Sequence, residues 1–331
     1  MVPFSILDLS PVAEGSTIRQ SLEGSARMAQ KAEEFGYKRF WLAEHHGMPG
    51  IASAATSIVI AHVGAATKRI RIGSGGIMLP NHSPLVIAEQ FGTLEALFPG
   101  RVDLGLGRAP GTDMRTAQAL RRNLDASNFP NDVVELQQLL GAPIENQAIL
   151  AVPGMNTNVP IWLLGSSLYS AQLAGMLGLP YAFASHFAPD SLLDALDIYR
   201  DRFQPSAVLD KPYAMVGVMG SVAETDEEAQ YHFTSAQQQF VNLRRNVRGQ
   251  FPRPVKDMES FWSPMEKMTV EHTLRYAVVG SQRAAEAKLG AFIKDTGADE
   301  VIISMPIHDI EARLKSVELF AGLGNFMRVA A

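Results

Sequence analysis

The chain has 331 residues, of which 47% are hydrophobic and 19% are charged, and its formal net charge is −5. This is the composition of a globular protein with enough apolar material for a sizeable core, and the lack of clustered lysine and arginine argues against nucleic-acid binding. There is no cysteine, which excludes disulfides and thiolate metal sites, and no signal peptide or membrane-length apolar run is recognisable, so we expect a cytoplasmic protein without membrane association.

Short runs of β-type character alternate along the chain with helical patterns. The predicted strands are residues 4–9, 39–43, 70–73, 102–107, 160–164, 181–184, 213–222 and 300–304. The predicted helices are residues 22–35, 53–67, 85–97, 112–140 with one break at 128–130, 169–177, 191–203, 282–295 and a last one from 310 onward. Eight strands, each followed by helix, predict an α/β protein with a (β/α)8 TIM barrel, and an open doubly wound sheet is the alternative.

The alternation breaks between the seventh and eighth predicted strands. Residues 224–277 are expected to hold two helices around an irregular stretch, residues 249–268, which contains Pro252, Pro254, Phe261, Trp262 and Pro264. Because this stretch is too apolar for a disordered linker, we expect a packed insertion at about residues 224–280 within a single domain that spans residues 1–331. Its position suggests a lid.

Histidines follow several predicted strands, at the end of the barrel where such folds carry their chemistry. They occur in Glu44-His45-His46 after strand two, at His82 after strand three and at His186 after strand six. Imidazole titrates near neutral pH, so His45 is a candidate general acid or base, and a hydrogen-bonded structural histidine is the alternative. Convergence of His45, His82, His186 and Glu44 on a metal ion would instead indicate a metal-dependent hydrolase.

The stretch Gly165-Ser166-Ser167-Leu168-Tyr169-Ser170 leads from a strand through a hydroxyl-rich turn into a helix. Free backbone N–H groups at such a helix start suit a phosphate, whereas the alternative is simple N-capping by Ser166 or Ser167. Arg108 follows strand four and would direct a permanent charge at an anion, with a surface salt bridge as the alternative. Ser74-Gly75-Gly76 indicates a bulge with close backbone approach, or a plain turn.

Five segments in this order resemble the luciferase-like monooxygenase family. They are Trp41 to His46, Gly73 to Pro84, Gly100-Arg101-Val102, Gly107-Arg108 and Leu164 to Ser170. Each motif is weak by itself, but the five in order along one barrel are specific, and they cover about residues 4–190.

The resemblance implies an FMN-dependent oxidoreductase that uses reduced flavin and O2 to oxidise a small organic substrate. It places the FMN phosphate at Arg108, Ser166, Ser167, Tyr169 and Ser170, the strand-three bulge beside the flavin ring at Gly75-Gly76, and the catalytic histidine at His45. Gly105 and Gly107 differ from the luciferases proper, which argues against light emission, and Ser166 stands where some members carry an acidic residue.

Several alternatives stay open at this point. A flavin-binding protein without enzymatic activity would have the same fold, and a deazaflavin could replace FMN. The resemblance also implies a homodimer formed through the helices after strands two and three, and a separate flavin reductase as partner. The organic substrate is not readable from the sequence, because one fold supports many chemistries.

Overall fold

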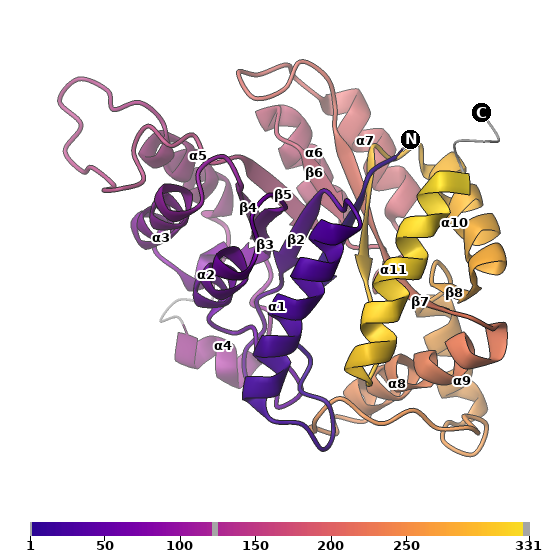
Figure 1. Cartoon of the computed structure of the whole chain (residues 1–331). Coiled ribbons are helices and arrows are strands. Elements are labelled where there is room, and N and C mark those ends of the chain that lie inside the picture. Colours follow the sequence, from indigo (N-terminus) through magenta and orange to yellow (C-terminus); the bar gives the residue numbers. More distant parts are fainter. Residues whose placement is uncertain (1, 121–124, 327–331) are drawn as a thin grey trace.

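The computed structural model, described for residues 2–120 and 125–326, is a closed barrel of eight parallel strands surrounded by helices (Figure 1). Around the barrel the strand order is β6-β5-β4-β3-β2-β1-β9-β7, and a β6–β7 pairing closes the circle. The predicted TIM barrel is therefore confirmed. The barrel strands are β1 (Phe4–Asp8), β2 (Arg39–Leu42), β3 (Arg71–Met78), β4 (Val102–Gly107), β5 (Ile161–Gly165), β6 (Tyr181–Phe183), β7 (Ala214–Ala223) and β9 (Glu300–Ser304).

Helices follow the strands and cover the outside of the barrel. The helices are α1 (Ile18–Glu34), α2 (Thr56–Ala66), α3 (Pro84–Leu97), α4 (Met114–Leu120), α5 (Phe129–Leu140), α6 (Leu168–Leu177), α7 (Leu192–Arg202), α8 (Asp226–Arg244), α9 (Pro264–Thr273), α10 (Gln282–Thr296) and α11 (Ile310–Phe326), with a 3-10 turn η1 (Leu79–Asn81) after β3. Among the described residues, no helix has the length and apolar character needed to cross a membrane.

Local sequence explains where these elements begin and which side they bury. Helix α1 starts with a capping box, in which the Thr17 hydroxyl accepts from the Gln20 N–H and the Gln20 side chain accepts from the Thr17 N–H. Its small residues Ala26, Ala29 and Ala32 recur on one side and are buried against the barrel. The strands are nearly fully buried because helices cover their outer side and side chains fill the barrel interior.

Three sequence expectations need correction. Strand three does not end at Gly73 but runs to Met78, because Gly75 and Gly76 form a bulge within the strand rather than a turn. A ninth strand, β8 (Val278–Ser281), was not predicted; it is only four residues long and pairs with the part of β7 that extends beyond the barrel. The helix break predicted at residues 128–130 lies slightly earlier, since residues 125–128 are not helical and α5 begins at Phe129 with Pro130 in its first turn; residues 121–124 of the predicted helix lie outside the described residues.

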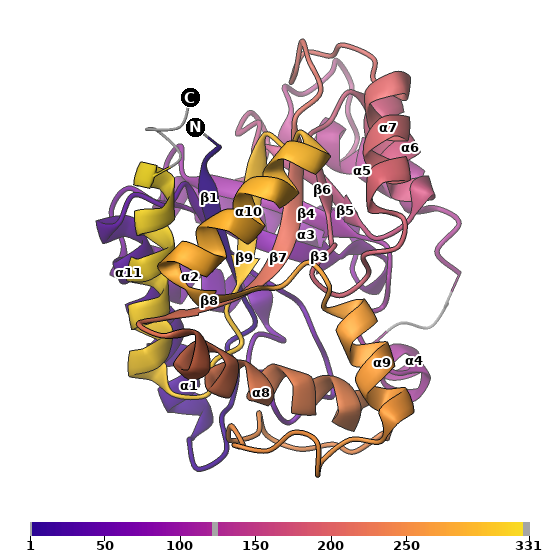
Figure 2. The same ribbon diagram turned by 90° about the vertical axis from the view of Figure 1, so that its right-hand side faces the viewer.

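The segment between β7 and β9 covers the C-terminal end of the barrel. Helix α8 lies across this end, and residues 249–263 run along its far side (Figures 1 and 2). Phe251 pairs with Ala13 in the loop after β1, and Trp262 and Met258 are buried in an apolar cluster with α8, α9 and β8. The expectation that this stretch is packed is confirmed.

Candidate functional site

Gly75 and Gly76 lie within the last part of β3, and the other residues singled out from the sequence lie beyond the carboxyl ends of β2, β3, β4, β5 and β6. Because these strands are parallel neighbours in one closed barrel, their ends share one mouth. The sequence predicts a site at this mouth, and the structure shows how the individual side chains are held.

Glu44 is the centre of a hydrogen-bond cluster at this mouth. Its buried carboxylate accepts from His46 Nε2 at 2.7 Å, from His82 Nε2 at 3.0 Å and from the Met78 backbone N–H at 3.0 Å. Burial alone would raise the pKa of Glu44, but the hydrogen bonds from His82, His46 and Met78 outweigh it and hold that pKa below its usual value. His46 and His82 are therefore positioned by a buried charge, a role that the sequence did not reveal.

His45 is half-buried and is oriented through a backbone carbonyl. Its Nδ1 lies 3.2 Å from the Gly111 carbonyl oxygen. A carbonyl only accepts, so Nδ1 carries the hydrogen and Nε2 of the neutral ring is left as an acceptor. Burial is the largest influence on His45 and lowers its pKa, which keeps the ring neutral near pH 7.

His186 follows β6 and lies against β7. A Cβ at Gly217 would collide with His186 Nδ1, so the glycine is what makes room for the ring. The ring packs edge-on against Phe187, and Nδ1 is buried without a hydrogen-bond partner among the described residues. Burial, reinforced by repulsion from a charged His45, lowers the pKa of His186 to about 4.

Gly75 and Gly76 are joined by a cis peptide bond, within the β3–β4 register irregularity. A Cβ at Gly75 would lie 2.6 Å from Leu7 Cδ1, and one at Gly76 would lie 2.7 Å from the Gly105 carbonyl oxygen. At Gly76 the obstacle is backbone, so only glycine fits there, whereas a side chain at Gly75 would have to displace Leu7.

Arg108 and Tyr169 come together from different strand ends. The exposed guanidinium lies over the Tyr169 ring, 4.3 Å from its centroid, and so stands beside the start of α6. Ser167 is the N-cap residue of α6, but its side chain makes no capping hydrogen bond, so the N-capping alternative is not what this serine does. Ser166 is half-buried beside it, while the Ser170 hydroxyl donates to the Ser167 carbonyl at 2.9 Å.

A further ion pair at the mouth was missed. Asp8, at the end of β1, accepts from Arg313 of α11 at 2.6 Å, and both side chains are buried. The only sequence sign was an acidic residue ending the first strand, because its partner lies 305 positions away.

Unsatisfied polar atoms concentrate at this end of the barrel. Among the described residues, the buried side-chain atoms without a hydrogen-bond partner include Asp8 Oδ2, Asn81 Oδ1 and His186 Nδ1, each of which follows a different barrel strand. Buried polar atoms without partners are costly, so their clustering indicates a place where a ligand or water completes the bonding.

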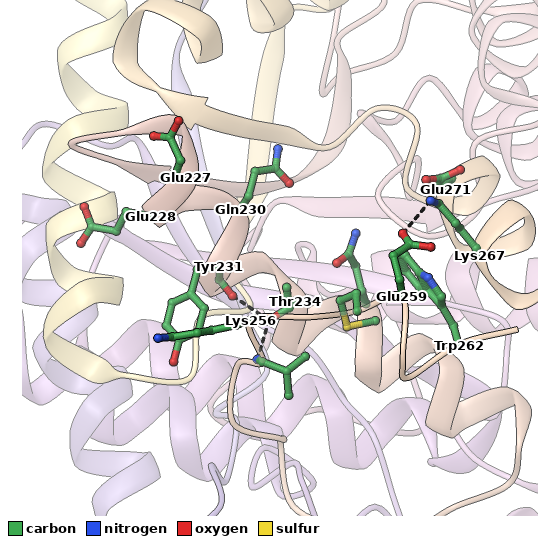
Figure 3. Close-up of a pocket in the computed structure, with 13 residues that line it drawn as sticks. Glu227, Glu228, Gln230, Tyr231, Thr234, Lys256, Glu259, Trp262, Lys267 and Glu271 are labelled. Carbon is green, nitrogen blue, oxygen red and sulfur yellow. Dashed lines mark hydrogen bonds and ion pairs between the residues drawn. The ribbon is translucent and has the colours of Figure 1, made fainter. Parts of the chain in front are cut away.

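A metal centre at the mouth and a hollow elsewhere in the molecule are two other candidate ligand sites. In residues 2–120 and 125–326, no group of three or more His, Asp or Glu side chains is placed to hold a metal ion, so His45, His82, His186 and Glu44 do not form a metal centre there. An open hollow of about 720 Å³ lies between α8 and residues 255–271 (Figure 3), but none of the sequence-predicted site residues lines it. Four glutamates and two lysines line it, and this excess of negative charge would disfavour an anionic ligand.

Comparison with known proteins gives consistent results. The family model described as "Luciferase-like monooxygenase" matches residues 2–300. A "Luciferase-like monooxygenase" of Escherichia coli K12 is 53% identical over 320 residues, which cover 96% of this chain and 96% of that protein.

Two solved structures are also similar. The crystal structure of apo-MsnO8 has a TM-score of 0.91 at 34% identity and covers 98% of this chain and 99% of that one. The oxygenating constituent of 3,6-diketocamphane monooxygenase from Pseudomonas putida, in complex with FMN, has a TM-score of 0.70 at 17% identity and covers 97% and 96%, respectively. At that identity the second likeness concerns the fold alone.

Proposed function

The chain belongs to the luciferase-like monooxygenase family, and from this premise we propose that it uses reduced FMN and O2 to oxidise a small organic substrate. The observation that carries this proposal is the pairing of Arg108 with Tyr169 beside the uncapped start of α6, at the same barrel mouth as the Gly75-Gly76 bulge and the neutral His45.

The side chains at the mouth fit a flavin mononucleotide. Arg108 supplies a fixed positive charge, and the free N–H groups of α6 with the hydroxyls of Ser166 and Ser167 supply donors for a phosphate. We assign the flat ring to the side of the Gly75-Gly76 bulge, and the unpartnered atoms at the mouth offer polar contacts. Ser170 has a different role. Its hydroxyl donates to the Ser167 carbonyl and is hydrogen-bonded to the Tyr181 hydroxyl, 3.2 Å away, so it stabilises the turn.

When bound, reduced flavin would supply the electrons with which O2 is activated. The protein would supply position, proton transfer and shielding. His45, with Nδ1 bound to Gly111, presents Nε2 as the proton acceptor, and its lowered pKa makes the neutral base available near pH 7. Helix α8 and residues 249–263 cover the mouth and limit the access of water.

A homodimer and a separate flavin reductase belong to the same proposal. Most side chains of α2 are apolar, and Ile58 on α2 and Val86 and Leu97 on α3 are exposed apolar side chains. A second copy of the chain would bury this surface. The reductase would provide the reduced flavin.

The proposal is tested by titrating the purified protein with FMN, oxidised and reduced, and with the deazaflavin F420, by fluorescence and calorimetry. We expect FMN to bind in the micromolar range or tighter and the Arg108→Ala variant to bind it about tenfold or more weakly, since it lacks a charge-assisted phosphate contact. Arg115→Ala, which changes an exposed arginine of the neighbouring α4, is the control. Preferential binding of F420 would replace FMN as the cofactor, and binding of neither would overturn the proposal.

A further inference from the structure

We propose that Trp41, Trp162 and Tyr213 form a path along which an oxidising equivalent leaves the flavin site and crosses the barrel to its N-terminal end. We call these three side chains the aromatic line. The inference rests on the proposed flavin-dependent function and adds to it a protective one-electron activity. It is carried by the contacts between the rings, by the position of each end of the line and by the charged groups around it.

The two tryptophans of the line fill the interior of the barrel. Trp41 of β2 and Trp162 of β5 are 0% and 3% exposed, and they belong to an apolar cluster that is separate from the core beneath the helices. The other buried members of this cluster come from barrel strands or their ends, and they are Leu7, Ala43, Ala182, Met215 and Ile302. The indole rings therefore lie among strand residues rather than against the surrounding helices.

The three rings contact one another in sequence. Trp41 and Trp162 meet edge to face with their centroids 5.2 Å apart, and Trp162 and Tyr213 meet in the same way at 5.7 Å. Because the chain has no cysteine, tryptophan and tyrosine are its side chains most readily oxidised by one electron, and two of its three tryptophans lie in this line. An electron can pass from ring to ring along the line without any further group.

One end of the line lies against the bulge that we assign to the flavin ring. A Cβ at Gly75 would lie 3.2 Å from Trp41 Cβ and 3.3 Å from Trp41 Cε3, so the tryptophan is in direct contact with this part of β3. A one-electron oxidant at the bulge would be either the light-excited flavin or a radical derived from oxygen. Trp41 is the member of the line that such an oxidant reaches first.

The other end of the line is Tyr213, which directly precedes β7 and is half-buried. Its hydroxyl donates to Glu300 Oε2 at 2.8 Å and accepts from Lys38 Nζ at 2.7 Å. The buried carboxylate of Glu300 is thus in place to take the phenolic proton when Tyr213 loses an electron. Since Tyr213 is more exposed than either tryptophan, a reductant in solution can reach this end of the line.

The charge of Arg39 favours Tyr213 over the tryptophans as the place where the oxidising equivalent stays. The guanidinium lies 5.8 Å from the ring centroid of Trp41 and 4.6 Å from that of Trp162. A positive charge at this position disfavours a second positive charge on either indole ring. Tyr213 loses its proton together with its electron and becomes neutral, so it avoids this repulsion.

Each step moves one electron toward the mouth. Trp41 gives one electron to the oxidant, Trp162 replaces that electron, and Tyr213 replaces the electron of Trp162. The phenolic proton passes to Glu300, which leaves a neutral tyrosyl radical. A thiol or ascorbate in solution then returns one electron to Tyr213, and Glu300 returns the proton. As a result, the oxidant is reduced by one electron and the reductant in solution is oxidised by one electron.

The test uses blue light on the FMN-loaded protein and electron paramagnetic resonance of frozen samples. Ring-deuterated tyrosine in the protein identifies a tyrosyl radical by its narrowed spectrum. We expect a tyrosyl radical in the wild-type protein and a signal at least tenfold smaller in Tyr213→Phe. Tyr276→Phe, which changes a tyrosine between α9 and β8 that packs against Phe292, is the control and should keep the full signal. Absence of a tyrosyl radical in the wild-type protein, or an equal signal in Tyr213→Phe, would overturn the inference.

A second variant interrupts the line in its middle. Trp162→Phe should remove the tyrosyl radical although Tyr213 is still present, because the electron can no longer pass through an indole at this position. Trp262→Phe, which changes the tryptophan of the cluster around α8 and α9, is the matched control and should keep the radical. A tyrosyl signal in Trp162→Phe as large as that in Trp262→Phe would show that the electron does not travel along the line.

The protective role has a readout of its own. Wild-type protein and Tyr213→Phe are illuminated in air with FMN and ascorbate, and oxidised residues are located by mass spectrometry. Tyr213→Phe should accumulate severalfold more oxidised Trp41 and Trp162, because the end of the line that ascorbate reaches has lost its hydroxyl. Equal oxidation of these tryptophans in the two proteins would contradict the protective role.

FMN affinity is measured in the same samples by fluorescence titration. Bound FMN without a tyrosyl radical would overturn the inference about the aromatic line alone. No FMN binding by the wild-type protein would overturn the proposed function and, with it, the inference that rests on it.

Discussion

Buried carboxylates lie at both ends of the barrel, but the hydrogen bonding around them differs. At the N-terminal end, Asp103 and Glu300 are completely buried, and Arg39 bridges them at 2.7 and 2.9 Å. Arg71 binds Asp103 and the Tyr213 hydroxyl donates to Glu300 at 2.8 Å, so each carboxylate has several donors. At the C-terminal end, Glu44 is held by histidines, while Asp8 Oδ2, Asn81 Oδ1 and His186 Nδ1 have no hydrogen-bond partner in the part of the chain that the structure describes.

This difference shows how one parallel sheet separates stability from function. The network around Arg39 is complete without any ligand, and a fully satisfied buried network rigidifies the barrel. The mouth contains donors, acceptors and titratable rings whose bonding is incomplete. In barrels of this kind, the N-terminal end serves stability and the C-terminal end serves chemistry.

The largest expected effect concerns the mouth. His45→Ala should lower turnover by about 10²- to 10⁴-fold, because it removes the positioned proton acceptor. FMN affinity and thermal stability should change little, since the Gly111 carbonyl is the one hydrogen-bond partner of the ring within the described chain. Steady-state kinetics measures this, with His62→Ala, an exposed histidine on α2, as control. Full activity of the variant would remove His45 from the reaction.

The next effect concerns the opposite end. Arg39→Met should lower the free energy of unfolding by about 3–5 kcal/mol, because it leaves Asp103 and Glu300 buried without their shared cation. Urea denaturation measures the change. Arg19→Met, which breaks an exposed pair with Glu23 on α1, is the control and should not shift the midpoint. Equal midpoints for the two variants would show that the network contributes nothing to stability.

A smaller effect is the pH dependence of the free energy of unfolding that His186, at the C-terminal end, should cause. The pKa of His186 is lowered from 6.5 to about 4 in the folded chain. Between these two pH values His186 takes up a proton in the unfolded chain but not in the folded chain. The free energy of unfolding is therefore not reduced by His186 above pH 6.5, and it falls as the pH decreases toward 4.

Because of His186, the free energy of unfolding should fall by about 2 kcal/mol between pH 6.5 and pH 4, a value that allows for the partial exposure of the ring. His186→Phe, which keeps the ring packing against Gly217, should flatten the acidic slope of unfolding free energy against pH. Leu193→Ala, which changes an exposed side chain of α7 without an ionisable group, is the control and should leave this slope unchanged. An unchanged slope in His186→Phe would contradict the lowered pKa.

The smallest effect concerns Glu44. Glu44→Gln keeps the shape of the side chain but removes its charge, and we expect a loss of about 1.5 kcal/mol in unfolding free energy near pH 7, as the hydrogen bonds from His46 and His82 lose their charged acceptor. Because the pKa of Glu44 is lowered, this contribution should disappear only as the pH falls through and below the usual carboxylate range. Identical stability of variant and wild type at pH 7 would show that the cluster does not depend on the carboxylate.

The sequence by itself determined the barrel and the end of it at which the candidate site residues lie. Alternating β-type and helical runs are local patterns, and parallel strands with crossover helices allow few closed arrangements. His45, Arg108 and the serines of residues 166–170 follow strand ends, so their position at one mouth also follows from chain order.

Only the tertiary structure decided how those side chains are held. Arg39 meets Glu300 across 261 positions and Asp8 meets Arg313 across 305, because β1 pairs with both β2 and β9 when the barrel closes. His82 contacts Glu44 rather than His45, and the short strand β8 forms only because β7 extends far enough to pair with it. Periodicity in a sequence reports the local path of the backbone, whereas these contacts depend on which distant segments the closed barrel brings side by side.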